Sequence, residues 1–151
     1  MKNDVVQIVL ALLALVVGCA LEELLPKIAG VGFPILMCTT VFMASRRRIP
    51  LLICFAIAAG AAEDSLSGLP PATSSSFFLA VAALAKWSEF PNGALVMAYP
   101  VYQGWLRIWT GVVCGAVFYR ALVAIPLGVV TALATWVVMM WAERSVAIDE
   151  S

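Results

Sequence analysis

The sequence predicts an all-α integral membrane protein, a bundle of about six transmembrane helices. Of its 151 residues, 64% are apolar and only 12% are charged, whereas soluble domains are about half apolar and about a quarter charged. A chain of this size buries only about two-thirds of the surface that its unfolded form exposes, so the remaining apolar side chains must face lipid. We expect residues 1–151 to form a single polytopic membrane domain.

The charged and reactive residues argue against several classes of function. The formal net charge is zero and no basic tract occurs beyond Arg46–Arg48, so we expect no nucleic-acid partner. The chain has no histidine, no glycine-rich phosphate loop and no serine beside a suitable base, so we expect no enzyme and no catalytic residue. The four cysteines lie in apolar runs without a Cys-x-x-Cys pair, which favours buried free thiols and predicts neither a metal site nor a cofactor. They are Cys19, Cys38, Cys54 and Cys114.

A first span is expected over residues 5–25, an apolar run long enough to cross a bilayer. Lys2 and the apolar run after it are also typical of a secretory signal, and residues 16–19 resemble a lipoprotein cleavage box. Because Asp4 weakens the positive leader and the apolar pattern continues through Leu24, we expect an uncleaved span.

The second and third spans are expected over residues 29–45 and 49–62. The second begins near Pro34, which the first turn of a helix tolerates, and it ends at three arginines. The third is short for a full crossing. A polar segment with two prolines, residues 63–76, follows it and leads into an equally short fourth span, residues 74–90.

The fifth and sixth spans are expected over residues 94–118 and 122–142, joined by a tight connection at residues 119–121. The fifth contains Pro100. The sequence therefore predicts six spans. Five is the alternative, if residues 49–90 form a re-entrant hairpin or if the fifth span is not one helix.

The basic residues predict the orientation, because short cytoplasmic loops carry an excess of lysine and arginine. With the N-terminus inside, six basic residues are cytoplasmic and two are outside. Both termini are therefore expected in the cytoplasm. The six are Lys2, Arg46, Arg47, Arg48, Lys86 and Arg144, and the two are Lys27 and Arg120.

Two interpretations stay open for Glu63 and Asp64, at the end of the third span. They are either solvated interface residues, or Asp64 is partly buried and accepts hydrogen bonds from Ser65, from Ser67 or from the start of the next helix. Small residues at four-residue spacing near this point favour close helix packing. They are Ala56, Gly60 and Asp64 in the third span, and Gly111 and Gly115 in the fifth.

Arg107 is the single most unusual residue, because its neighbours are apolar and aromatic. A cation at the bilayer centre costs roughly 2.5–3.5 kcal/mol on the most lenient scale. We expect it to pair with Glu63, with Asp64 or with an acid of a partner protein. The alternative is an arginine near a helix end that extends its charge to the interface.

The stretch of residues 60–70 resembles the MreD family, bacterial membrane proteins that determine rod shape. It is similar to the family's G-x-x-x-D-x-x-S-G pattern through Gly60, Asp64, Ser67 and Gly68. The chain length, the five to six spans, the Gly32–Pro34 entry to the second span and the basic loop are also similar. Two positions depart from the family. Members often carry glycine where this chain has Ala72, and an acidic residue where it has Ile35.

The resemblance implies a non-enzymatic scaffold of the cell-elongation complex in the bacterial inner membrane, which helps to control cell shape and lateral peptidoglycan synthesis. The partners it implies are MreC, MreB and the glycosyltransferase–transpeptidase pair of the lateral wall, besides membrane lipid. The residues expected to form the structural or partner-contact site are Gly60, Glu63, Asp64, Ser67, Gly68, Pro70 and Arg107.

The family is also similar in fold to the S components of energy-coupling-factor transporters, and this gives an alternative from another class. Such a protein binds a small molecule in a cavity near the outer face. It needs convergent polar groups in its core. The candidates are Thr39, Thr40, Gln103, Arg107, Thr110 and residues 63–76.

Overall fold

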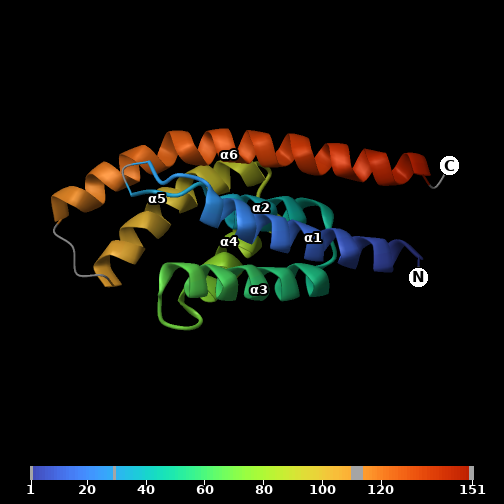
Figure 1. Cartoon of the computed structure of the whole chain (residues 1–151), viewed down its shortest axis with the longest axis horizontal. Coiled ribbons are helices and arrows are strands. Elements are labelled where there is room, and N and C mark those ends of the chain that lie inside the picture. Colours follow the sequence, from blue (N-terminus) through green and yellow to red (C-terminus); the bar gives the residue numbers. More distant parts are fainter. Residues whose placement is uncertain (1, 29, 110–113, 150–151) are drawn as a thin grey trace.

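The computed structural model describes the backbone of residues 2–28, 30–109 and 114–149, and the side chains of residues 4–28, 30–104 and 118–146. The described residues form six α-helices (Figure 1) and a single isolated β-bridge between Ile28 and Val31. The helices are α1 (Lys2–Leu24), α2 (Ile35–Arg46), α3 (Ile49–Ser67), α4 (Thr73–Trp87), α5 (Pro91–Trp109) and α6 (Cys114–Asp149). The prediction of an all-helical fold is confirmed.

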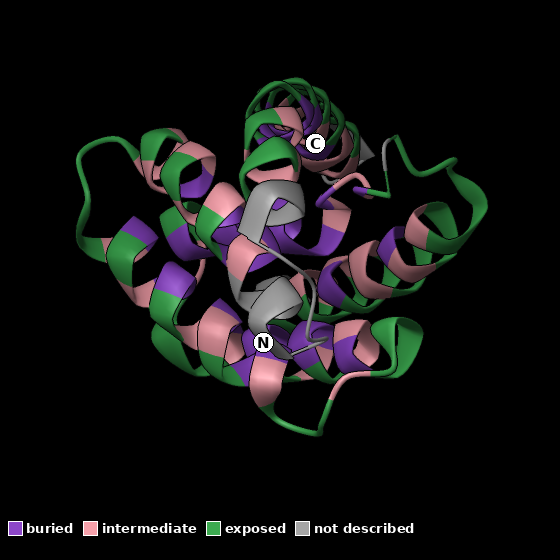
Figure 2. Ribbon diagram, turned by 90° about the vertical axis from the view of Figure 1, so that its left-hand side faces the viewer, coloured by how far each residue is buried: buried purple, intermediate pink, exposed green. Residues whose placement is uncertain are grey.

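Three helices contain segments that are long and apolar enough to cross a membrane, namely Asp4–Leu24, Ile49–Ser67 and Phe118–Val146. The segments in α1 and α6 are mostly unburied, and apolar side chains such as Val16 and Val137 are 65% and 67% exposed. In Figure 2 the exposed positions form the outer surface of the helices and the buried ones face the centre. An apolar outer surface of this kind is that of a protein surrounded by lipid.

Helix α2 forms the centre of the bundle and contacts all five other helices. Its residues 36–44 are all buried. The two buried threonines, Thr39 and Thr40, donate to the carbonyl oxygens of Ile35 and Leu36 in their own helix, which satisfies their hydroxyl groups without another partner. Both hydroxyl groups are therefore engaged within their own helix.

Two of the helices are short. Helix α2 has 12 residues and α4 has 15, which correspond to about 18 and 22 Å at 1.5 Å per residue, against a hydrocarbon core of about 30 Å. The structure thus has six helices, of which three are long and apolar enough to span the membrane among the described residues. Six complete crossings stay a prediction.

Several predicted boundaries are wrong. The third helix does not end at residue 62 but continues through Glu63 and Asp64 to Ser67, because neither glycine nor proline stands between residue 62 and Gly68. The second begins at Ile35 rather than at residue 29, after Pro34. The polar connection between α3 and α4 is therefore only residues 68–72.

The predicted connection at residues 119–121 is also wrong, because these residues lie inside α6. Tyr119, Arg120 and Ala121 all support a helix, and no glycine or proline stands among them. The expected single helix over residues 94–118 is instead divided between α5, which ends at Trp109, and α6, which begins at Cys114. The side chains of Gly111 and Gly115 fall outside the described residues.

The cysteines differ from one another in burial. Cys38 is buried and Cys19 is half-buried, as expected of small apolar side chains. Cys54 is exposed, so its predicted burial is wrong. It lies on the outward face of α3, where surrounding lipid rather than protein would cover an apolar thiol. The side chain of Cys114 is outside the described residues.

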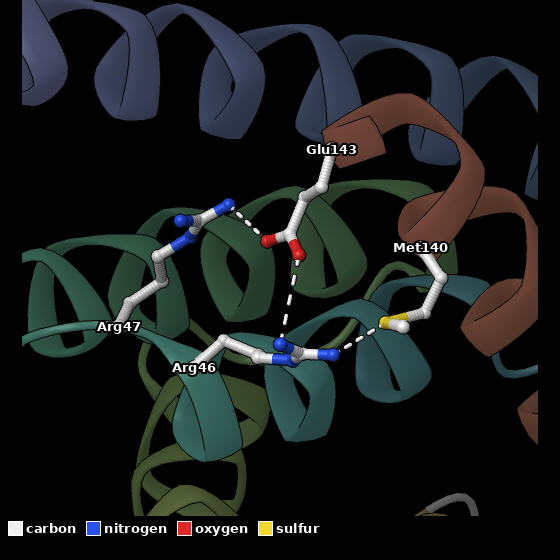
Figure 3. Close-up of polar contacts among 4 residues, drawn as sticks. All are labelled: Arg46, Arg47, Met140 and Glu143. Carbon is white, nitrogen blue, oxygen red and sulfur yellow. Dashed lines mark hydrogen bonds and ion pairs between the residues drawn. The ribbon is translucent and has the colours of Figure 1, made fainter. Parts of the chain in front are cut away.

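The C-terminal ends of α2, α4 and α6 meet in a polar cluster at the end of the molecule where the two chain termini lie (Figure 1). Arg47 Nη2 lies 2.5 Å from Glu143 Oε1, and Arg46 Nη1 lies 4.0 Å from Glu143 Oε2 (Figure 3). Lys86 Nζ donates to the carbonyl oxygen of Arg47 at 3.0 Å. Three residues predicted to be cytoplasmic, Arg46, Arg47 and Lys86, therefore lie at the same end of the bundle as the two termini.

Helices α3 and α4 pack closely because Gly60 has no side chain. A Cβ atom at residue 60 would overlap the backbone N and Cα atoms of Ser75 and lie 2.8 Å from the carbonyl carbon of Ser74. Ser75 Oγ also donates to the carbonyl oxygen of Ile57 at 3.1 Å. The contact is thus backbone against backbone, the geometry that small residues at four-residue spacing permit.

We predict that Gly60→Ala lowers the free energy of unfolding by about 1–3 kcal/mol, because the added methyl group must push α3 and α4 apart. Thermal unfolding in maltoside micelles measures the change. The control is Gly93→Ala, where the nearest atom to the new Cβ is Phe90 Cβ at 3.6 Å, so no loss is expected. Equal stability of Gly60→Ala and wild type would contradict the packing described.

Candidate functional site

The side chain of Asp64 joins the two helices of the α3–α4 hairpin. It is 5% exposed, and its Oδ1 atom accepts a hydrogen bond of 2.8 Å from the backbone N–H of Ser74, in the first turn of α4. The residue that precedes α4, Ala72, provides no side-chain cap. Asp64 therefore caps α4 from another helix, where free N–H groups and the helix dipole favour a carboxylate.

The other hydrogen bonds foreseen for Asp64 are not formed. Ser65 Oγ donates to the carbonyl oxygen of Ala61, and Ser67 Oγ donates to Glu63 Oε1 at 3.0 Å. Of the three expected donors, only the start of the next helix bonds to Asp64. Its Oδ2 atom is buried without a hydrogen-bond partner among the described residues.

The connection between α3 and α4 uses two left-handed backbone conformations. Gly68 ends α3 with φ 65°, and its N–H donates to the carbonyl oxygen of Asp64. Ala72 precedes α4 with φ 70°. Between them, the carbonyl oxygen of Pro70 accepts from Thr73 Oγ1 at 2.8 Å. Glycine adopts such a conformation freely, whereas alanine does so at a cost of about 1–2 kcal/mol.

Arg107 lies in α5, but its side chain is outside the described residues, as is Thr110. The pairing of Arg107 with Glu63 or Asp64 therefore stays a prediction. Exchanging the charges of Arg107 and Asp64 tests it, since a true pair tolerates the double exchange better than either single one.

The C-terminal ends of α1 and α3 and the start of α6 lie at the end of the bundle opposite the chain termini (Figure 1), and a cavity of about 410 Å³ lies among them. It is lined by the C-terminal halves of α1 and α3, by the segment before α2, by the middle of α5 and by the start of α6. Of the predicted site residues, Glu63 and Ser67 line it, whereas Gly60, Asp64, Gly68 and Pro70 do not. Two of these six residues therefore line the cavity, and the other four lie within the α3–α4 hairpin.

Two carboxyl groups meet in the wall of this cavity. Glu22 of α1 and Glu63 of α3 both line it. Glu22 Oε1 also accepts a hydrogen bond of 2.7 Å from the backbone N–H of Leu36, in the first turn of α2. Glu22 therefore caps α2 from another helix, just as Asp64 caps α4.

The opposite wall is formed by Tyr99, Tyr102 and Gln103 of α5, all buried. Tyr99 OH donates to the carbonyl oxygen of Gly32, and Gln103 Nε2 donates to Tyr99 OH at 3.1 Å. Tyr102 OH and Ser74 Oγ share a hydrogen bond of 2.7 Å. These bonds hold the aromatic wall to both the segment before α2 and the start of α4.

Two cations complete the lining. The Arg120 guanidinium of α6 donates to the carbonyl oxygen of Gly30, and its Nε atom is buried without a partner among the described residues. Lys27 lines the cavity from the exposed segment after α1. With Glu22, Glu23 and Glu63, the lining carries three acidic and two basic side chains.

Sequence reasoning missed Glu22, Tyr99, Tyr102 and Arg120 as members of one site. Two of them, Glu22 and Arg120, could have been found from their positions along the chain, because both fall near predicted outer boundaries, as Glu63 does. Tyr99 and Tyr102 lie within an apolar span, away from its boundaries, so their positions along the chain did not mark them as site residues. The chain matches no family model, no curated protein and no solved structure.

We predict that Asp64→Ala lowers the free energy of unfolding by about 1–2 kcal/mol, because it leaves the Ser74 N–H without its cap. Asp64→Asn keeps a side-chain oxygen and should lose less. Chemical or thermal unfolding in micelles measures both, with the exposed Ser65→Ala as the control. A loss from Ser65→Ala as large as that from Asp64→Ala would argue against the cap.

We predict that Ala72→Gly raises the free energy of unfolding by about 0.5–1 kcal/mol, because it relieves the left-handed backbone at a small entropic cost. The matched control is Ala61→Gly, at an exposed position within α3, which should lose about 1 kcal/mol. The same assay compares the two variants. A loss of stability in Ala72→Gly would show that the left-handed conformation is absent.

Proposed function

We propose that the chain is a multi-pass protein of the bacterial inner membrane, with both termini in the cytoplasm, and that it acts as a non-enzymatic MreD-like scaffold. In this role it binds the membrane and periplasmic proteins of the cell-elongation complex, MreC among them, and so helps to control cell shape and lateral wall synthesis. The α3–α4 hairpin carries the proposal.

The observation that supports it best is the backbone at residue 72. The family that the sequence resembles often carries glycine there, and this chain has an alanine whose φ angle is 70°. A left-handed position is one where glycine is favoured on physical grounds. The departure at Ala72 is thus a substitution within the same hairpin geometry, rather than a sign of a different one.

The second departure from the family pattern lies at the start of α2 and is compensated by another acidic side chain. The family often carries an acidic residue directly after Pro34, where this chain has Ile35, the first residue of α2. An acid there would favour the N-terminus of α2. In this chain the carboxyl group of Glu22 reaches the same turn and accepts from Leu36 N–H, so the helix start keeps an acidic side chain as its cap.

The shape of the hairpin suits a scaffold. Gly60, Asp64 and Ser74 fix α3 against α4 without a mobile side chain at the contact. Asp64 is too buried for a partner to contact, so its role is to hold the hairpin. The surface that a periplasmic partner would meet is formed by the exposed Leu66, in the last turn of α3, and the exposed Pro70 of the connection. The outward apolar faces of α1 and α6 offer docking surfaces for spans of other proteins.

The alternative is a small-molecule-binding S component of an energy-coupling-factor transporter. The cavity of about 410 Å³ favours it, because its volume lies within the range of small-molecule sites. A transporter subunit must also assemble with an ATPase module. The two functions therefore differ in the proteins that they bind.

Affinity purification and depletion test the proposal in the bacterium that encodes the chain. We predict that the tagged chain co-purifies with MreC, that its depletion turns rods into spheres, and that Ser65→Ala restores the shape whereas Asp64→Ala restores it poorly. Normal rods after depletion, without MreC in the purified complex, would contradict the scaffold. Co-purification with an ATPase module and stabilisation by a vitamin would favour the transporter.

A further inference from the structure

The carboxyl pair in the cavity lacks a positive partner within the part of the chain that the structure describes. Glu22 and Glu63 both line the cavity, and the ion pairs of Arg46 and Arg47 are with Glu143, at the opposite end of the bundle. Two carboxyl groups in the wall of one cavity favour a proton or a cation beside them, because like charges disfavour the ionisation of both.

Each of these two carboxyl groups accepts a hydrogen bond from the chain through its Oε1 atom. Glu22 Oε1 accepts from Leu36 N–H, and Glu63 Oε1 accepts from Ser67 Oγ. Of the two cations of the lining, Arg120 is directed to the segment before α2, because its guanidinium donates to the Gly30 carbonyl oxygen. The remaining oxygens suit a donor with several N–H bonds and a positive charge, which is an ammonium group.

The rest of the cavity suits the body of an organic ligand rather than a bare ion. Aromatic rings of Phe33, Phe78, Tyr99 and Tyr102 line it, and such faces attract an organic cation. Its volume of about 410 Å³ is much larger than one ion needs and matches small-molecule sites. The lining also has more acidic than basic side chains.

We propose that this cavity binds a small organic cation, with an ammonium group between Glu22 and Glu63 and an apolar portion against the tyrosine wall. The ammonium group belongs either to a free amine or to the headgroup of an ethanolamine phospholipid, because the cavity lies at the end of the bundle. The site goes beyond the scaffold function and does not depend on it.

Thermal unfolding of the full chain in maltoside micelles, which contain no ammonium group, tests the proposal. The probes are 2-phenylethylamine, the neutral 2-phenylethanol and the anionic 3-phenylpropionate at equal ionic strength. We expect the amine alone to raise Tm in a saturable way. Equal shifts from all three probes, a larger shift from the anion, or no shift from the amine would each overturn the proposal.

Substitutions of the two cavity glutamates test where the amine binds. Glu63→Gln and Glu22→Gln each remove one charge, and the glutamine at residue 22 still provides an oxygen for Leu36 N–H. We expect each to weaken amine binding about tenfold, the loss of one charged hydrogen bond. The control is Glu89→Gln, exposed and outside the cavity, which should bind as wild type does. Wild-type affinity in both cavity variants would overturn the assignment.

A lipid arm distinguishes the two sources of the ammonium group. Short-chain phosphatidylethanolamine and phosphatidylglycerol are added to the same micelles. Stabilisation by the ethanolamine lipid that Glu63→Gln abolishes supports a lipid headgroup, and stabilisation by the amine alone supports a free ligand. Equal stabilisation by both lipids, unchanged in Glu63→Gln, would count against recognition of ammonium at this site.

Discussion

The hydrogen bond from Ser74 N–H to Asp64 Oδ1, with the bare backbone of Gly60 beside it, is the constraint on which the outer part of the structure depends. It fixes where α4 begins relative to α3. The Ser74 hydroxyl then bonds to Tyr102 OH, which positions α5. Tyr99, three residues earlier on α5, binds the segment before α2. One buried carboxylate thus sets the wall of the cavity through its neighbours.

The molecule has two polar ends separated by an apolar middle. At one end Arg46, Arg47 and Lys86 meet Glu143 near the chain termini, and at the other Glu22 and Glu63 face a cavity. The buried middle is mostly apolar, with α2 at its centre. In lipid, polar groups at depth are costly, so they gather at the ends or bond within their own helices.

Composition was enough to predict an all-helical membrane protein, and the Gly60–Gly68 motif was enough to identify the hairpin. The helix boundaries were harder, because apolar runs fix which residues avoid water but not where backbone hydrogen bonds end. Glu63 and Asp64 looked like a loop for that reason, yet they lie in α3. Likewise Arg120 looked like a loop cation and lies in α6.

The cavity was beyond sequence reasoning for a different physical reason. It depends on Glu22, Tyr102 and Arg120 reaching one point from three helices, and nothing in their spacing along the chain relates them. The caps at Leu36 and Ser74 are also tertiary, since each acid comes from another helix. Local cap patterns in the sequence therefore could not reveal them.

The most direct test of this account is the side of the membrane on which each end of the α3–α4 hairpin lies. In a variant without the four native cysteines, Ser67→Cys and Ser88→Cys are labelled separately in intact cells with a membrane-impermeant thiol reagent. The account predicts that residue 67 reacts from outside and residue 88 only after lysis. Labelling of both from the same side would show that the hairpin does not cross the membrane, and would contradict it.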